Sequence, residues 1–161
     1  MAEVSNVPIA YLDSSVLIAF LYEKQEHPAR FEQVRRLVSA IRERILIGLV
    51  SFYVLPELYG HVQANQPENE INLVFRLSLV ELFGIPLTIV PFLNREDLNR
   101  LRQQFVIADS DDVRHVASAL FNKCDAIITF DHDFQQVANL IPAHTPAEFL
   151  ATLTKKNNVE E

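Results

Sequence analysis

The amino-acid sequence predicts an α/β fold in which a mostly parallel sheet carries helices on both faces. Two observations support this prediction. Short apolar runs read as strands that are buried on both faces. Segments with the helical spacing of apolar residues separate these runs along the chain. Strands that alternate with helices run parallel, because each helix returns the chain to the start of the next strand.

The first third of the chain is expected to alternate between strands and helices. The run Ile9–Leu12 predicts the first strand, and Ser14 and Ser15 offer an N-cap for the helix that follows. A long helix is expected at about 28–44, where apolar residues form one stripe. The second buried strand is expected at 46–50.

The helix after the second strand contains Pro56 and Glu57. Ser51 is expected to cap this helix, and Pro56 requires either a place in the first turn or a kink. The remaining elements are expected in chain order: a helix at about 68–83, a strand at 87–90, helices at about 95–105 and 110–123, a strand at 126–129, a short helix at about 132–139, and a last helix that opens with the capping-box pattern of Thr145 and Glu148.

The composition is that of an ordinary globular protein. The 161 residues fit one domain, and the shares of hydrophobic residues (49%) and charged residues (22%) argue against a disordered chain. Only three glycines occur, which excludes a glycine-rich phosphate-binding loop. The single cysteine, Cys124, suits a reducing compartment. Since neither a signal peptide nor a bilayer-spanning apolar run is recognisable, we expect a cytoplasmic protein without a membrane segment.

The net charge of −7 argues against generic nucleic-acid binding, which usually relies on a basic surface. Cations bound by some of the carboxylates would offset this charge locally. Arginines concentrate in the segments 30–44 and 95–102, and their simplest interpretation is that they lie on solvated helix faces. Cations bound in this way would soften the objection that the net charge raises to a nucleic-acid substrate.

Four acidic residues are expected at one edge of the sheet. Asp13 and Asp131 follow predicted strands, so they lie at the carboxyl edge, where sites form in open α/β sheets. Glu57 lies early in the helix after the second strand, near the same edge. Asp112 opens a helix that leads into a strand, and such a helix begins at the carboxyl edge. Topology thus places four acids from four segments together.

Clustered carboxylates repel one another unless cations compensate their charge. Oxygen ligands without a histidine or thiolate pattern suit Mg²⁺ or Mn²⁺, and such a site is suited to phosphodiester hydrolysis. Each acid alone also has a simpler interpretation: a turn or cap residue for Asp13, a surface acid for Glu57, a helix-dipole partner for Asp112 and a loop acid for Asp131. Their joint placement favours the metal site.

Five short motifs occur in order along the chain: Tyr11–Ile18, Ser51–Leu58, Asp112–Ala119, Ile128–Phe134 and Thr145–Leu150. In this order they resemble the motifs of PIN-domain ribonucleases, in particular the VapC-type toxins of bacterial toxin–antitoxin pairs. The likeness spans about 9–150. Each motif is weak alone, and their shared order makes the resemblance specific.

The resemblance implies a single PIN-like domain at 1–153, with a polar tail at 154–161 and a five-stranded parallel sheet in the order 3-2-1-4-5. It implies Mg²⁺ or Mn²⁺ as cofactor, RNA as substrate, a homodimer, and a protein antitoxin as partner. It also assigns residues to the site: Asp13, Glu57, Asp112 and Asp131 as catalytic, metal-binding acids, and Ser15, Thr129 and Asp133 as accessory residues. His115 is interpreted as a packing residue of its helix.

Two departures from the family pattern affect the site. Pro56 next to Glu57 leaves the direction of that carboxylate open, and Asp109 and Asp111 compete with Asp112 as the third ligand. The leading hypothesis is an endoribonuclease that uses metal-activated water, and the alternative is an inactive PIN-like module that binds protein or RNA. A phosphatase of the haloacid dehalogenase type is disfavoured, because Ser15 stands where its second aspartate is required.

Overall fold

The computed structural model describes residues 7–157 and contains one five-stranded sheet. The strands are β1 (Ile9–Leu12), β2 (Ile47–Ser51), β3 (Thr88–Val90), β4 (Ala126–Ile128) and β5 (Ala143–His144). Their order is β3-β2-β1-β4-β5, and every pairing is parallel. The predicted fold class and strand order are confirmed, with β1 at the centre of the sheet.

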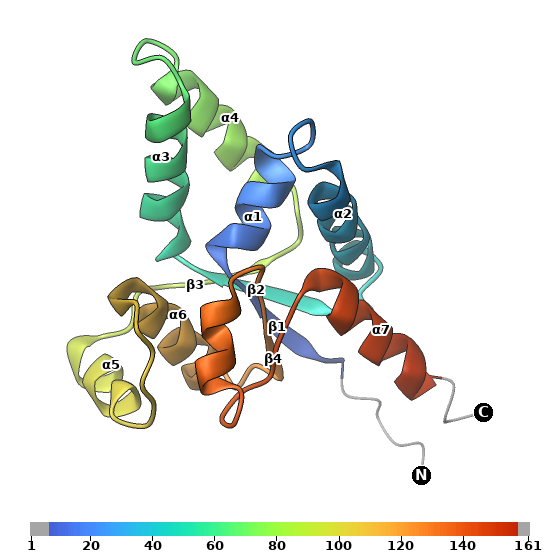
Figure 1. Ribbon diagram of the computed structural model, residues 1–161, viewed down its shortest axis with the longest axis vertical. Helices are drawn as coiled ribbons and strands as arrows, with labels where there is room; N and C mark the ends of the chain where they lie inside the picture. Colours follow the sequence, from blue (N-terminus) through green and yellow to red (C-terminus); the bar gives the residue numbers. More distant parts are fainter. Residues whose placement is uncertain (1–6, 158–161) are drawn as a thin grey trace.

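Helices cover both faces of this sheet (Figure 1). They are α1 (Ser14–Leu21), α2 (Pro28–Arg42), α3 (Val54–Asn65), α4 (Ile71–Phe83), α5 (Arg95–Arg102), α6 (Ser110–Phe121), the 3₁₀ helix η1 (His132–Val137) and α7 (Pro146–Asn157). Helices α1, α2, α3, α4 and α7 pack on one face, while α6 and η1 pack on the other. Helix α5 lies beside α6.

Side chains of β1 alternate between two cores, as the pleat of a strand requires. Ala10 and Leu12 belong to the larger core, under α1, α2 and α7. Tyr11 points to the opposite face and joins the smaller core, which includes Val116 of α6. This register brings the Tyr11 hydroxyl close to helix α6.

The carboxyl ends of the strands meet at one edge of the sheet. The backbone N–H of Asp13 donates to the carbonyl of Ile128 at 3.0 Å, which aligns the ends of β1 and β4. The N–H of Phe52 donates to the carbonyl of Val90 at 3.0 Å, which aligns the ends of β2 and β3. Helices α1 and α3 begin at this edge, so acids in their first turns or caps converge there.

Two predicted helix caps are wrong. Asp13, rather than Ser14 or Ser15, is the N-cap of α1, because its carboxylate accepts the N–H of Ser15. Ser51 is the last residue of β2 and is fully buried; α3 begins at Val54 without a side-chain cap. The helix therefore starts just before Pro56, which lies in its first turn, where the missing N–H breaks no helical hydrogen bond.

Other differences are small. The two-residue strand β5 is too short to show a pattern, so only the resemblance implied it, and the short helix after β4 is a 3₁₀ helix. The predicted capping box is present: Thr145 N donates to Glu148 at 2.7 Å, and Glu148 N donates to Thr145 Oγ1 at 3.3 Å. Helix α7 extends through 154–157 of the predicted tail; residues 158–161 lie outside the described range.

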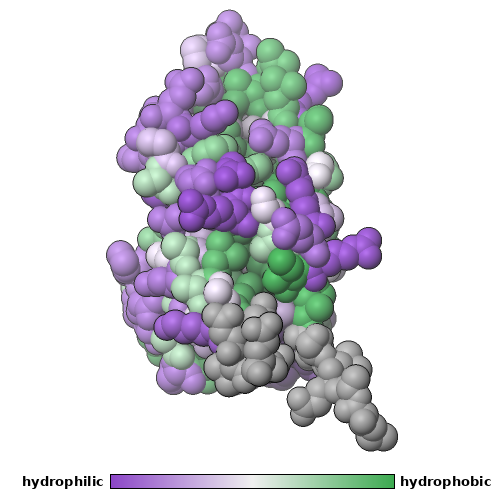
Figure 2. Space-filling view, turned by 90° about the vertical axis from the view of Figure 1, so that its right-hand side faces the viewer, coloured by the Kyte–Doolittle hydropathy of each residue, from purple (hydrophilic) through white to green (hydrophobic). Residues whose placement is uncertain are grey.

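The outer surface mixes polar and apolar residues. On the face shown in Figure 2, hydrophobic patches lie between hydrophilic residues. Within residues 7–157, no helix combines the length and apolar character that crossing a membrane requires.

Candidate metal centre

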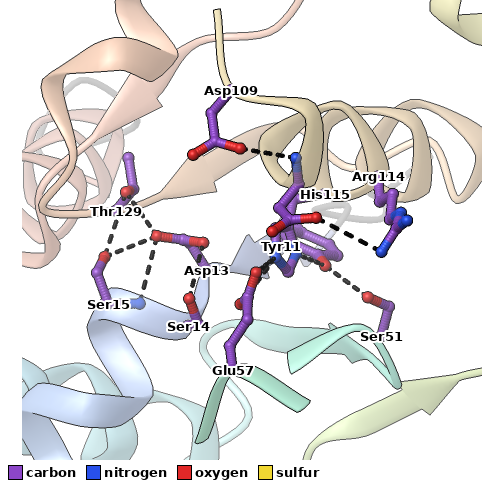
Figure 3. A network of polar contacts seen from close by, with 11 residues as sticks. Tyr11, Asp13, Ser14, Ser15, Ser51, Glu57, Asp109, Arg114, His115 and Thr129 are labelled. Carbon is purple, nitrogen blue, oxygen red and sulfur yellow. Dashed lines mark hydrogen bonds and ion pairs between the residues drawn. The ribbon is translucent and has the colours of Figure 1, made fainter. Parts of the chain in front are cut away.

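Asp13 lies at the end of the central strand and is held by hydroxyl donors from two elements. The residue as a whole is buried, with 4% of its surface exposed. The oxygen Oδ2 accepts hydrogen bonds from Ser15 Oγ at 2.7 Å and from Thr129 Oγ1 at 2.9 Å (Figure 3). Thr129 Oγ1 also accepts the N–H of Asp131 at 2.9 Å, and Ser15 Oγ accepts the N–H of Phe130 at 3.0 Å. The two hydroxyls thus link Asp13 to the turn that carries Asp131.

Glu57 receives a hydrogen bond from a buried histidine on another helix. Nε2 of His115 lies 2.9 Å and 3.0 Å from the two carboxylate oxygens of Glu57. The other ring nitrogen, Nδ1, lies 2.6 Å from the hydroxyl of Tyr11, and this hydroxyl lies 2.6 Å from Ser51 Oγ. A hydrogen-bonded chain therefore runs from β2 through β1 and α6 to α3 (Figure 3).

The pKa shifts of Tyr11, Glu57 and His115 define which groups in this chain carry protons. Burial raises the pKa of Tyr11, so its hydroxyl stays protonated. Burial disfavours the charged form of Glu57, but the hydrogen bond and charge of His115 outweigh it and lower the pKa of Glu57. Burial likewise lowers the pKa of His115, but the hydrogen bond to Glu57 and nearby negative charges raise it overall. Nε2 therefore carries a proton, which it donates to Glu57.

A second group of acids contains Asp112 of α6, Asp131 and Asp133. Each offers a carboxylate oxygen, and these atoms lie within 4.8 Å of one another. Asp131 caps η1 by accepting the N–H of Asp133 at 2.9 Å. Burial, together with the charges of Asp13, Asp109 and Asp131, raises the pKa of Asp112 to about 7. Such a group repels further negative charge and attracts a cation.

The four predicted acids lie at one edge but fall into two adjoining groups. Asp13 and Glu57 join His115, with ligand atoms within 4.8 Å of one another, and Asp112 and Asp131 join Asp133. The groups are close enough for Asp13 and Asp131 to raise the pKa of Asp112. These donors are mostly carboxylate oxygens, which fit Mg²⁺ or Mn²⁺.

Of the three neighbouring aspartates at the start of α6, only Asp112 belongs to a group of acids. Asp109 is an exposed N-cap whose carboxylate accepts the N–H of Asp111 at 2.8 Å. Asp111 is exposed and pairs with Arg114 at 3.5 Å. Asp112 is half-buried and lies in the acidic group.

Tyr11, Ser51 and His115 are contacts of the site that the sequence did not reveal. His115 is 1% exposed, as a packing residue of α6 should be, and yet it also contacts Glu57. Its polar ring on the mostly apolar buried face of α6 is the available signal, since buried polar groups need partners. The partners could not be identified, because Tyr11 is 104 residues away along the chain.

Solved structures with a similar fold include three from bacteria. VapBC2 of Rickettsia felis, bound to a promoter DNA fragment, is 17% identical with a TM-score of 0.56, covering 83% of this chain and 96% of that one. VapC20 of Mycobacterium tuberculosis, a sarcin–ricin-loop-cleaving toxin, is 11% identical with a TM-score of 0.60, covering 83% and 97%. VapBC-1 of nontypeable Haemophilus influenzae is 15% identical with a TM-score of 0.53, covering 86% and 98%.

These identities are low, so the likeness concerns the fold. A search of curated proteins found no match. The family model of the PIN domain matches residues 10–140, which include the whole of both acidic groups. That span covers most of the chain, and the family resemblance seen in the motifs is thereby confirmed: the chain belongs to the PIN-domain family.

Proposed function

We propose that this protein is a metal-dependent endoribonuclease in which Asp13, Glu57, Asp112 and Asp131 hold Mg²⁺ or Mn²⁺. The observation that carries the proposal is the convergence of acids from four elements into two adjoining groups at the carboxyl edge of the sheet. An uncompensated cluster of this kind is unfavourable, as the raised pKa of Asp112 indicates. Bound cations supply the missing positive charge.

A bound cation would supply hydroxide from water and would stabilise negative charge on the phosphodiester oxygens. The residues of the chain position the ligands. Ser15 and Thr129 hold Asp13, and His115 holds Glu57. Asp133 supplies a further carboxylate next to Asp131. With water as the nucleophile, no covalent intermediate with the protein is expected.

The proposal extends to a cytoplasmic toxin of a type II toxin–antitoxin pair, acting as a homodimer with a protein antitoxin as its partner. Its support is the fold shared with two VapBC proteins and with VapC20, a toxin that cleaves the sarcin–ricin loop. Co-expression with the product of the adjacent reading frame tests the partnership. Co-purification and loss of toxicity are the expected results. If the protein is toxic and neither binds nor is neutralised by the product of any adjacent reading frame, the pairing is contradicted.

Cleavage of total cellular RNA tests the nuclease itself. Purified protein is incubated with Mg²⁺ or Mn²⁺ and, separately, with EDTA, next to the variants Asp13→Asn and Glu68→Gln. Glu68 is an exposed acid in the loop between α3 and α4 and serves as the control. Cleavage is expected to require the metal, to vanish in Asp13→Asn and to persist in Glu68→Gln. Full cleavage by Asp13→Asn would overturn the role of Asp13.

The alternative is an inactive PIN-like module that binds protein or RNA without cutting. Clustered carboxylates repel one another, and a protein that only binds a partner has no use for them. The acidic groups therefore disfavour the binding module. Calorimetric titration with Mn²⁺ separates the two functions. A protein that binds no Mn²⁺ and cuts no RNA would be such a module.

A further inference from the structure

The acidic edge is the carboxyl edge of the sheet, where Asp13, Glu57, Asp112 and Asp131 lie. A small pocket with aromatic walls opens next to it. It has a volume of about 130 Å³ and is lined by Tyr53, Pro56, Glu57, Phe92, Asp111 and Arg114. Sites for drug-sized ligands have roughly 300–1,000 Å³, so this pocket has room for a single planar ring system. Glu57 belongs both to the pocket wall and to the group that it forms with Asp13 and His115.

The walls of the pocket offer flat apolar surface. Phe92 is 54% exposed, although it contacts Tyr53 edge-on at a ring distance of 4.8 Å. The Tyr53 side chain is held in place by a hydrogen bond, since its hydroxyl accepts the backbone N–H of Leu93 at 3.2 Å. An exposed aromatic ring that is held in place by its neighbours is a stacking platform for unpaired bases.

Arg114 supplies positive charge at the rim. Its guanidinium carbon lies 5.7 Å from the centre of the Tyr53 ring, and about half of its side chain is exposed. Its ion pair with Asp111 is long, at 3.5 Å, and both partners are exposed, so the pair contributes little. Arg114 is therefore available for a phosphate or a base, on a chain whose net charge is −7.

From these features we infer that the Tyr53–Phe92–Arg114 pocket binds one unpaired nucleobase of single-stranded RNA, adjacent to the phosphodiester held at the acidic edge. This inference rests on the proposed nuclease function and specifies its substrate as RNA with a base that can leave the stack. The base stacks on Phe92, and Arg114 contacts its flanking phosphate. Recognition of splayed bases on aromatic side chains is common in RNA-binding proteins.

The test measures RNA affinity without cleavage. A fluorescein-labelled single-stranded RNA is titrated with protein carrying Asp13→Asn, in Mg²⁺, and anisotropy is recorded. On this background, Phe92→Ala is expected to weaken binding roughly 5- to 150-fold, the range seen when one base loses its aromatic platform. Phe92→Tyr keeps a ring and should restore affinity. Phe121→Ala is the control, since Phe121 is exposed at the other end of α6.

A second measurement separates stacking from a structural role of Phe92. The same RNA is prepared with a single abasic nucleotide at each position in turn. In the protein that keeps Phe92, the abasic nucleotide at one position should weaken RNA binding as much as Phe92→Ala does. The same abasic RNA should bind to Phe92→Ala no more weakly than the intact RNA does, because the base and the ring form one contact. Arg114→Gln should make the slope of log affinity against log salt concentration shallower by about one, the amount that corresponds to one lost phosphate contact.

Three outcomes would overturn the inference. If the native chain cuts RNA while neither Phe92→Ala nor any abasic position changes affinity, the pocket is not a base site and the nuclease proposal stands. If Phe92→Ala keeps its RNA affinity but loses a protein partner, the pocket is a protein contact. If the native chain binds Mn²⁺ but neither binds nor cuts RNA, the inference and the proposed function fail together.

Discussion

His115 on α6 donates a hydrogen bond to Glu57 on α3, with Nε2 at 2.9 Å and 3.0 Å from the two carboxylate oxygens. The imidazole is 1% exposed, whereas the side chain of Glu57 is 27% exposed. A rigid buried donor therefore directs a carboxylate that opens toward solvent. This contact sets the direction of the Glu57 carboxylate, which the neighbouring Pro56 leaves open in the sequence.

His115→Ala is expected to weaken Mn²⁺ binding and cleavage roughly 10- to 100-fold, because loss of an outer-shell partner typically has this effect on a metal site. Calorimetric titration with Mn²⁺ measures the affinity, and circular dichroism checks that the variant is folded. His27→Ala is the control, since His27 is exposed at the start of α2. Unchanged Mn²⁺ affinity in a folded His115→Ala protein would contradict the positioning role.

Tyr11→Phe is expected to lower the free energy of unfolding by about 1–3 kcal/mol, because it leaves buried polar atoms of Ser51 and His115 without this partner. Cleavage should change less, since the hydrogen bond to Glu57 remains. Urea denaturation measures the difference, and Tyr59→Phe at the surface is the control. The double variant Tyr11→Phe/Ser51→Ala should lose less than the sum of its parts, and strict additivity would show that the hydroxyls do not interact.

The acidic edge was predictable because it follows from topology alone. Once β1 and β4 are parallel neighbours, Asp13 and Asp131 must lie at the same edge, whatever their side chains contact. The chain from Ser51 to His115 was not predictable, because it depends on which face of β1 carries Tyr11 and on how α6 packs against it. For the same reason the sequence predicts Ser51 as a helix cap: its position suits a cap, but the strand extends through it.

Thr129→Val and Thr129→Ser form a matched pair. The hydroxyl of Thr129 donates to Asp13 and accepts the N–H of Asp131, so it ties the two acids together. Valine has nearly the same shape but lacks the hydroxyl, and we expect about a tenfold loss of kcat/KM. Serine keeps the hydroxyl and should retain most of the activity. Equal rates for the two variants would mean that shape, and not hydrogen bonding, matters at this position.

Asp112→Asn is expected to stabilise the metal-free protein most at pH 8 and by a smaller amount at pH 5. Burial and the charges of Asp13, Asp109 and Asp131 raise the pKa of Asp112 from 3.8 to about 7. Between pH 3.8 and about pH 7 the folded chain binds more protons than the unfolded chain, so the stability that Asp112 contributes declines over this range and is lost once the pH has risen through about 7. Asparagine carries no charge and avoids this loss.

The same carboxylate makes metal binding depend on pH in the opposite direction. A cation requires the ionised form, so the affinity of the native chain for Mn²⁺ should rise as the pH passes about 7. Thermal melts at pH 5 and pH 8, with and without Mn²⁺, test both effects in one experiment. Mn²⁺ should raise the Tm of the native chain most at pH 8, where it relieves the repulsion, and should raise the Tm of Asp112→Asn much less. If Asp112→Asn melts lower than the native chain at pH 8 without metal, the carboxylate stabilises the fold and the repulsive arrangement at this edge is refuted.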